Sequence, residues 1–389
     1  MPETTLTTEK YYLPTHTNGV RLICAYNKYT RGGGEGKGKG RIILVLGHGG
    51  GFSKEHYEPF LHDIFALEAS YCQREPDSRS LKGPKYLIRE AWALDAPNHG
   101  ESGVMNEHEL VRNPGVADIW DNASAFTTLL SSGLFGPLDK GYHQVIVCGH
   151  SAGSVAAVLS TQYFNPPASL PFNSLILIDP AMWSRSLGEK GFKSPMYQAY
   201  ANSVLTRRDV WRSKEEAREW MRKREPGRGW DERVFDTFIE HGLRPLPTAH
   251  YPHLTSGVTL TTHRSDENMA FSGRLYSLDA ADRLSQICRF RRVHLVYGGK
   301  ADMFSREVQD SLNSPNEGRI FASITRLSKR VGHLASLFLV VQEAPLELAQ
   351  AMFDILLKEV EFGDDLGAGI PVVGTNAGHA TKEAPSSKL

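Results

Sequence analysis

The sequence predicts an α/β fold in which a mostly parallel central sheet is flanked by helices. The first support is a set of short, continuous apolar runs at residues 41–46, 144–148 and 174–178, which are typical of strands covered on both faces. Segments with helical character separate these runs, and right-handed crossovers between them would give a parallel sheet. Residues 181–286 interrupt this alternation and therefore predict an insertion into the fold.

The N-terminal element is expected to be an antiparallel hairpin over residues 10–30, because Asn18-Gly19 is a strong turn signal between two apolar stretches. The glycine-rich stretch at 32–40 lacks the Gly-Lys-Ser/Thr ending and the helix of a phosphate-binding loop, so we interpret it as a surface loop. Periodicity and turn signals predict further strands at 86–94, 292–297 and 320–324, and helices at about 57–69, 115–133 and 336–359.

These elements predict a chain organised in four parts. Residues 1–180 and 287–361 would form the two halves of one core, residues 181–286 an inserted helical cap, and residues 362–389 a flexible tail. The charge-dense stretch at 207–233 within the cap has opposite charges at i,i+4 spacing, which favours a salt-bridged helix surface over a site for the phosphates of a coenzyme A ester.

The composition argues against several classes of function. The chain of 389 residues has 44 basic and 44 acidic side chains, whereas a nucleic-acid-binding surface needs a clustered basic excess. No apolar run approaches the ~18–20 residues of a membrane span, and the N-terminus lacks the basic and apolar regions of a secretory signal. Four cysteines, all isolated, favour a reduced intracellular protein without disulfides, and we expect neither a metal nor a cofactor.

The pentapeptide Gly149-His150-Ser151-Ala152-Gly153 lies between a predicted strand and a predicted helix. This is the context of a nucleophile elbow, in which a sharp turn exposes a serine hydroxyl at the edge of the sheet. Because the turn leaves almost no room for side chains two residues before and after the serine, glycine is needed at both positions. We therefore interpret Ser151 as a catalytic nucleophile rather than an incidental turn residue.

A second glycine-rich turn, Gly47-His48-Gly49-Gly50-Gly51, ends the predicted strand at 41–46. A turn of this kind can direct backbone N–H groups at the oxygen of a carbonyl under attack by the serine. With the amide of Ala152, either Gly50 or Gly51 would form the oxyanion hole. Asp95 and His99, which follow the strand at 86–94, are expected to pin their loop and are left out of the catalytic set.

His333 follows the last predicted strand and is the expected general base, because the chain order serine, acid, histidine then holds. Two carboxylates compete for the acid that orients it. Asp302 follows the next-to-last strand, the commoner position, and the residue pattern slightly favours it. Asp179 follows the strand after the elbow helix and is the alternative.

The elbow, the glycine-rich turn, the Asp95–Gly100 loop, Leu177-Ile178-Asp179-Pro180 and the C-terminal tripeptide together resemble fungal peroxisomal hydrolases with the α/β-hydrolase fold. The resemblance is strongest to the abhydrolases of host-selective toxin biosynthesis clusters and to the peroxisomal acyl-CoA hydrolase of mycophenolic acid biosynthesis. It implies that Asp179 completes the triad, with Asp302 as the alternative, and that the substrate is an acyl ester or acyl-CoA thioester in secondary metabolism, such as one carrying an epoxy-decatrienoic acid moiety.

The C-terminal tripeptide Ser387-Lys388-Leu389 is a peroxisomal address that an import receptor reads. The sequence thus predicts a serine hydrolase of the esterase or thioesterase class in the peroxisomal matrix, acting on a small acyl substrate. Two alternatives remain open, an acyltransferase that uses the same serine and a non-catalytic binding protein on the same frame. The sequence also leaves open whether the chain forms a homodimer.

Overall fold

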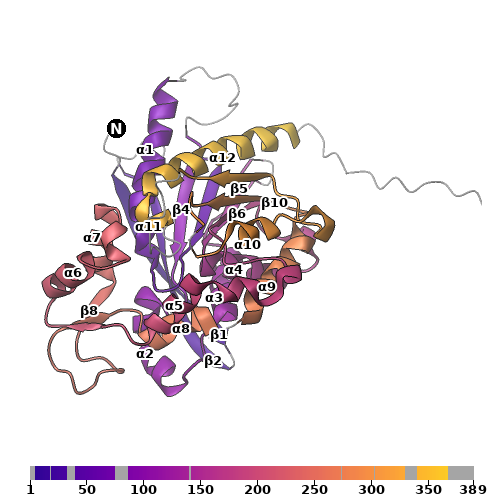
Figure 1. Ribbon diagram of the computed structural model, residues 1–389. Helices are drawn as coiled ribbons and strands as arrows, with labels where there is room; N and C mark the ends of the chain where they lie inside the picture. Colours follow the sequence, from indigo (N-terminus) through magenta and orange to yellow (C-terminus); the bar gives the residue numbers. More distant parts are fainter. Residues whose placement is uncertain are drawn as a thin grey trace, which may run out of the picture.

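The computed structural model describes residues 5–17, 19–32, 40–74, 86–139, 142–272, 274–301, 303–328 and 340–366. At its centre is an eight-stranded sheet in the order β1-β2-β4-β3-β5-β6-β10-β11 (Figure 1). β2 pairs antiparallel with β1 and β4, and every other pair of neighbours is parallel. The predicted mostly parallel sheet is confirmed. Its strands are β1 (Leu6–Thr17), β2 (Val20–Arg31), β3 (Ile42–Gly47), β4 (Ile88–Leu94), β5 (Gln144–His150), β6 (Ser174–Ile178), β10 (Arg292–Tyr297) and β11 (Ser323–Arg326).

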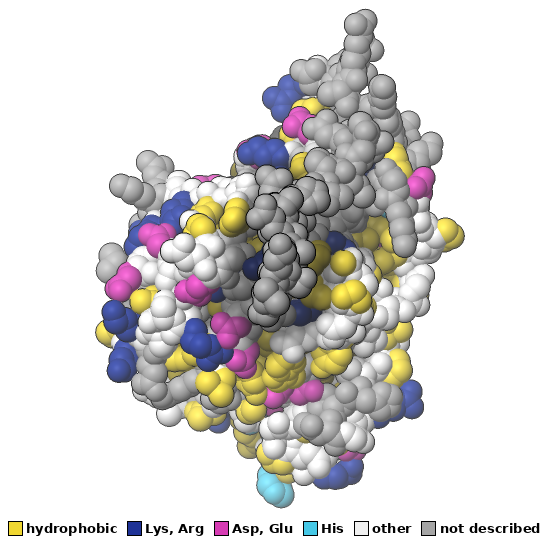
Figure 2. All heavy atoms as spheres, turned by 90° about the vertical axis from the view of Figure 1, so that its right-hand side faces the viewer, with side chains coloured by type: hydrophobic (Ala, Val, Ile, Leu, Met, Phe, Trp, Pro, Cys, Tyr) yellow, Lys and Arg dark blue, Asp and Glu magenta, His cyan; other side chains and the backbone are white. Residues whose placement is uncertain are grey.

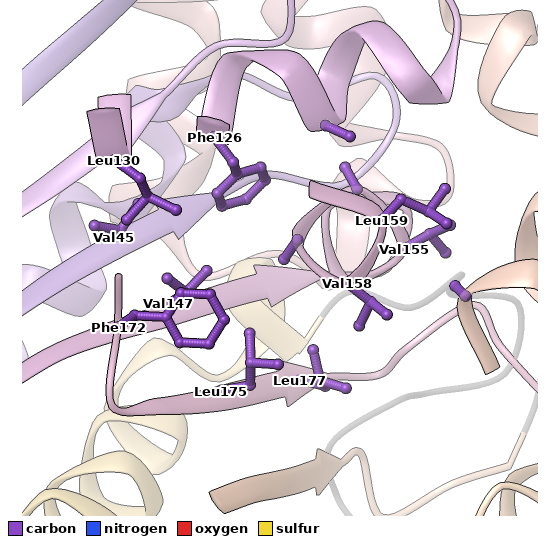
Figure 3. Close-up of a cluster of buried hydrophobic side chains, with 14 of the residues drawn as sticks. Val45, Phe126, Leu130, Val147, Val155, Val158, Leu159, Phe172, Leu175 and Leu177 are labelled. Atoms are coloured by element: carbon purple, nitrogen blue, oxygen red, sulfur yellow. The ribbon is translucent and has the colours of Figure 1, made fainter. Parts of the chain in front are cut away.

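Helices cover both faces of this sheet. One face packs against α1 (Glu58–Arg74) and α12 (Pro345–Leu366), which also contact each other. The other packs against α3 (Ile119–Ser131), α4 (Ala152–Leu159) and α9 (Arg274–Ile287). Figure 3 shows the second layer, where Val147 and Leu177 from the strands meet Phe126 of α3 and Val158 of α4. β3, β5 and β6 are buried along their whole length, as their continuous apolar runs predicted.

The insertion between β6 and β10 forms a cap at one side of the sheet (Figure 1). The predicted division of the chain stays a prediction, and the structure adds two features to it. The insertion contains a three-stranded antiparallel sheet, β7-β9-β8, as well as helices. In addition, α9 packs against α4 in the core although most of it lies before residue 287. The cap elements are α5 (Pro195–Val204), β7 (Val210–Trp211), α6 (Lys214–Arg222), α7 (Glu232–His241), β8 (Leu243–Pro245), β9 (Val258–Leu260) and α8 (Arg264–Ser272).

Three local features differ from the expectations. Two helices, α2 (Gly100–Arg112) and α10 (Arg306–Ser311), were not expected. The helix expected over 336–359 is, within the described residues, two helices, α11 (Val340–Glu343) and α12, and Pro345 starts the second because proline suits the first helical position. β11 begins three residues later than the expected strand at 320.

Basic and acidic side chains are interspersed over the face in Figure 2, in keeping with the balanced composition. Within the described part of the chain, no helix combines the length and the apolar character that a bilayer crossing requires.

Candidate active site

The turn between β5 and α4 has the backbone geometry of a nucleophile elbow. Ser151 has φ 53° and ψ −116°, a left-handed conformation that costs free energy for a residue with a side chain. A Cβ on Gly149 would lie 2.4 Å from the carbonyl oxygen of Gly153, and one on Gly153 would lie 2.5 Å from the carbonyl oxygen of Gly47. The two glycines therefore allow the close backbone approach that forces Ser151 into this conformation.

Two hydrogen bonds join the elbow to the neighbouring strand β6. The N–H of Ser151 donates to the carbonyl oxygen of Ile178 at 2.9 Å. The hydroxyl of Ser154, in the first turn of α4, donates to the carbonyl oxygens of Gly149 and Ile178. The position of the serine is thus coupled to the end of β6, where Asp179 follows.

The glycine-rich turn after β3 lies next to the elbow. Gly49 and Gly50 line the same small cavity as Ser151. The N–H of Gly51 donates to Nε2 of His99 at 3.0 Å, so this amide already has an acceptor. The N–H of Gly50 has no hydrogen-bond partner within the described residues, and that of Ala152 is in the first turn of α4, where helix N–H groups have no intrahelical acceptor.

Two buried histidines, His48 and His99, form hydrogen bonds with the backbone of the glycine-rich turn. Nε2 of His48 accepts from the N–H of Ala96 at 3.1 Å, so its Nδ1–H is the donor to the carbonyl oxygen of Gly49 at 2.7 Å. Burial lowers the pKa of His48, and it lowers the pKa of His99 well below the usual value. Both rings are therefore neutral at physiological pH, as their acceptor nitrogens require.

Asp95 anchors a buried network of charges beneath this turn. Its carboxylate accepts from Nζ of Lys54 at 2.9 Å and from the N–H of Glu101 at 2.9 Å. Nζ of Lys54 also contacts Glu55 at 2.7 Å and Glu101 at 2.9 Å. The three surrounding carboxylates raise the pKa of the fully buried Lys54 despite its desolvation. Asp95 and His99 thus fix the loops around the elbow, in agreement with the role expected for them.

Asp179 lies directly after β6 with φ 40°, the second non-glycine residue in a left-handed conformation within the described chain. It is 4 % exposed, and its Oδ1 accepts from the N–H of Gly298, after β10, at 2.9 Å. Burial raises its pKa to about 7, and Glu343 adds to this, while the Gly298 hydrogen bond opposes it. A buried carboxyl in strained backbone at a strand end beside the elbow is typical of a catalytic acid.

The other predicted site residues, namely Asp302, His333 and the tripeptide Ser387-Lys388-Leu389, lie outside the described residues. Met303 and Phe304, which follow Asp302, line the cavity in front of Ser151.

The cavity in front of Ser151 is small and mostly apolar. Its free volume is about 50 Å³. Core elements form the floor, and cap residues from α5, α8 and the segment before α7 form the roof. The lining residues are Gly49, Gly50, Phe52, Ile119, Ser151, Ala152, Val155, Ala181, Tyr197, Tyr200, Pro226, Ala270, Phe271, Tyr276, Ser277, Met303 and Phe304.

No pattern in the sequence indicated that a cap residue would contact the glycine-rich turn. Glu267 of α8 is 1 % exposed, and a Cβ on Gly51 would lie 2.8 Å from its carboxylate. Glu267 accepts from the hydroxyl of Tyr200 at 2.8 Å and from Nη1 of Arg207 at 3.0 Å. Glutamate within a polar helical stretch has no sequence feature that distinguishes it from a solvent-exposed residue.

One cluster away from Ser151 has the composition of a metal site. The ligand atoms of His250, His263 and Asp266 lie within 4.8 Å of one another. The two imidazole rings, however, are stacked with centroids 3.6 Å apart and planes 7° from parallel. Because imidazole lone pairs lie in the ring plane, two parallel stacked rings cannot both point at one ion. We therefore assign no metal to this cluster.

The fold, with a strained serine at the β5–α4 turn facing a glycine-rich turn, defines an enzyme of the hydrolase class. The model of the α/β hydrolase family matches residues 43–351, and the chain belongs to this family. A search of curated protein sequences gave no match.

Several solved structures share the fold at low sequence identity. The peroxisomal α/β-hydrolase Lpx1 from Saccharomyces cerevisiae has a TM-score of 0.63 and 18 % identity over 92 % of this chain and 90 % of that one. The thioesterase domain from the curacin biosynthetic pathway has a TM-score of 0.55 and 13 % identity, covering 90 % and 99 %. A putative hydrolase from Rickettsia typhi has a TM-score of 0.52 and 10 % identity, covering 90 % and 99 %.

Proposed function

We propose that the protein is a serine hydrolase that cleaves an acyl ester or acyl thioester through an acyl-enzyme. The observation that carries this proposal is the strained backbone of Ser151 at the β5–α4 turn. Ser151 lines a cavity together with Gly50, whose N–H has no hydrogen-bond partner within the described residues, and its own N–H donates to the carbonyl oxygen of the residue before the buried Asp179. Strain of this kind persists only where the surrounding structure enforces it, and it is concentrated at functional sites.

The mechanism assigns each step to a residue of this chain. Oγ of Ser151 attacks the substrate carbonyl carbon while His333 takes its proton, and the N–H groups of Gly50 and Ala152 stabilise the oxyanion. The leaving alcohol or thiol departs with the proton from His333. Water then attacks the acyl-enzyme while His333 takes a proton from it. As the bond between the acyl carbon and Oγ of Ser151 breaks and the acid is released, His333 passes this proton to Oγ. The pairing of the Gly51 N–H with His99 favours Gly50 as the donor from the glycine-rich turn.

Asp179 is the proposed acid, which would accept from Nδ1–H of His333 and stabilise the imidazolium that forms. Its position and burial support this role, and Asp302 is the alternative. Asp179→Asn and Asp302→Asn are compared in the same assay. We expect a loss of about 10⁴-fold in kcat for the first and a small effect for the second. The reverse result would move the role to Asp302, and two near-normal rates would exclude both.

Covalent labelling tests the nucleophile directly. A fluorophosphonate probe should label the protein at Ser151, and Ser151→Ala should abolish labelling and reduce hydrolysis of p-nitrophenyl butyrate and octanoyl-CoA by about 10⁴-fold or more. The variant should unfold at the same denaturant concentration as the parent. A non-catalytic protein would show no labelling. An acyltransferase would be labelled but would give mainly the acylated second nucleophile when an alcohol or amine is added.

The cellular setting is also part of the proposal. The C-terminal Ser387-Lys388-Leu389 supports import into the peroxisome, and the similar yeast structure is itself described as peroxisomal. A role in making a fungal secondary metabolite, such as a host-selective toxin with an epoxy-decatrienoic acid moiety, rests on the motif resemblance alone. A fluorescent fusion that keeps a free C-terminus should co-localise with peroxisomes, and deletion of the last three residues should leave it in the cytosol.

A further inference from the structure

The cap contains a second, larger cavity that the proposed chemistry does not use. Its free volume is about 380 Å³, within the range of small-molecule sites. The walls come from α5, β7, α6, α7, β9 and α8, and the floor includes Gly51 and Phe52 of the core. Seven aromatic side chains dominate the lining, namely Phe52, Tyr200, Trp211, Trp220, Trp230, Phe235 and Phe238.

This cap cavity adjoins the cavity in front of Ser151. Phe52, Tyr200 and Pro226 line both spaces, so these three side chains form the boundary between them. Phe52 directly follows the glycine-rich turn, and its ring lies 5.6 Å from that of Trp230. Phe52 therefore lies in the wall that separates the serine cavity from the aromatic lining of the cap cavity.

The charged residues around the cap cavity are largely neutralised by ion pairs. Arg207 is paired with the buried Glu267, and Nη2 of Arg208 lies 3.0 Å from Glu216. Arg224 has no carboxylate partner among the described residues, but its guanidinium lies 4.5 Å from the ring centroid of Trp220 and donates to that residue's carbonyl oxygen. Among the described lining residues, Arg224 is thus the single cation without a carboxylate partner, and an aromatic lining with one such cation suits an apolar guest and not a polyphosphate.

We propose that the cap cavity holds the apolar acyl chain of the substrate, with the carbonyl at Ser151 and the chain passing between Phe52, Tyr200 and Pro226. The serine cavity, at about 50 Å³, has room for a short acyl group only, so a longer chain requires the additional 380 Å³. This proposal rests on the proposed function of Ser151 and names the part of the substrate that the cap selects.

A series of p-nitrophenyl esters from acetate to tetradecanoate measures the chain-length dependence. We expect kcat/KM to rise about three- to fourfold per methylene as the chain extends into the cap cavity, and to level off or fall once it is full. A profile that peaks at acetate or butyrate in an active enzyme would overturn the cavity proposal and leave the serine mechanism intact.

A bulky substitution within the cavity tests the location. Met221 of α6 lines the cavity, and Met221→Trp should lower kcat/KM for decanoate by about tenfold or more while changing that for acetate by less than about twofold. Ser203→Trp, from α5, should act in the same direction if Met221→Trp fails to fold. The matched control is Lys223→Trp, an exposed position at the end of the same helix outside the cavity, which should keep the parent profile. If Met221→Trp and Ser203→Trp each lowered kcat/KM for acetate as much as for decanoate, the proposed location of the chain would be refuted.

Binding without turnover separates this inference from the catalytic one. In Ser151→Ala, cis-parinaric acid should quench tryptophan fluorescence saturably, because three of the six tryptophans line the cavity. Met221→Trp in the same background should weaken the apparent affinity about tenfold relative to Lys223→Trp. Saturable binding that Met221→Trp weakens would support the cavity even if no ester were hydrolysed. Quenching that is absent, or equal in the two variants, would reject the cavity even if hydrolysis occurred.

Discussion

Different interactions stabilise the surroundings of Ser151 and the cap. Around Ser151 the backbone itself is constrained, because Gly149 and Gly153 allow contacts that no side chain would permit, and buried polar groups are paired at short distance. In the cap, a cluster of aromatic side chains packs beneath helices whose charges form exposed ion pairs. The proposed nucleophile therefore lies on a turn whose close backbone contacts leave no room for added atoms, whereas the proposed acyl-chain site is enclosed by side-chain packing.

The most severe test of this comparison adds a methyl group at the elbow, in Gly153→Ala. In Gly153→Ala the new Cβ would lie 2.4 Å from the carbonyl oxygen of His48 and 2.5 Å from that of Gly47, and backbone cannot move aside cheaply. We expect a loss of about 5 kcal/mol or more in the free energy of unfolding, with little folded enzyme left. Urea denaturation followed by circular dichroism measures it.

The contrasting change, within the 181–286 insertion, is Gly188→Ala. Gly188 has a positive φ of 52°, which Gly153 does not have, and a Cβ on Gly188 meets nothing within 4 Å. The cost should be only the conformational strain, about 1–2 kcal/mol. Similar losses for the two substitutions would mean that the close approach at the elbow is not what limits this site.

The buried ion network gives the next largest effect. Lys54→Met removes the only cation that contacts all three of Asp95, Glu55 and Glu101 among the described residues. Because breaking a buried pair leaves uncompensated charge, the free energy of unfolding should fall by about 3–5 kcal/mol. Thermal unfolding at pH 7 measures it, and partial recovery in Lys54→Met/Asp95→Asn would trace the loss to charge.

The raised pKa of Asp179 predicts that the free energy of unfolding depends on pH. Its pKa is 3.8 in the unfolded chain and about 7 when folded, so between these pH values the folded protein keeps a proton that the unfolded chain has lost. The free energy of unfolding of the parent should therefore fall as pH rises through this window. Asp179→Asn removes this titration and should be more stable than the parent by roughly 2–4 kcal/mol at pH 8, with little difference below pH 4. Parallel stability curves for the two proteins across this range would contradict the raised pKa.

The smallest effect is expected for an ion pair of the cap. Arg218, whose side chain is 39 % exposed, pairs with Glu232 and Asp236. Arg218→Met should change the free energy of unfolding by about 1 kcal/mol or less, since exposed pairs are screened and costly to order. A loss as large as that of Lys54→Met would show that cap and core do not differ as described.

The sequence predicted the elements whose geometry is dictated locally. The pentapeptide around Ser151 predicted the sharp turn between strand and helix. The continuous apolar runs predicted the buried strands β3, β5 and β6. It could not predict contacts between distant segments. Nothing near Gly51 in the chain indicates that its N–H donates to His99. Because this hydrogen bond occupies the Gly51 N–H, the proposed oxyanion donors are Gly50 and Ala152.

The cap was predictable only in part, for a related reason. The amphipathic helices near 214–222 and 232–241 follow from periodicity. Of the two opposite-charge pairs at i,i+4 spacing, Arg212 and Glu216 form an ion pair, whereas within the described residues none joins Glu219 and Lys223. The three-stranded sheet was missed because its strands have only two or three residues each. The role of Glu267 depends on where α8 packs, which no local pattern encodes.

The cap leaves the core at the end of β6 and rejoins it at the start of α9, whose C-terminal end leads directly into β10. The crossover between two adjacent parallel strands is thus complete without it, since α9 alone spans the distance. We therefore expect that residues 181–273 can be exchanged for another segment without a shift in the register between β6 and β10. Such an exchange would replace the roof of the cavity in front of Ser151 and the contact of Glu267 with the glycine-rich turn, while the β5–α4 turn itself stays with the core.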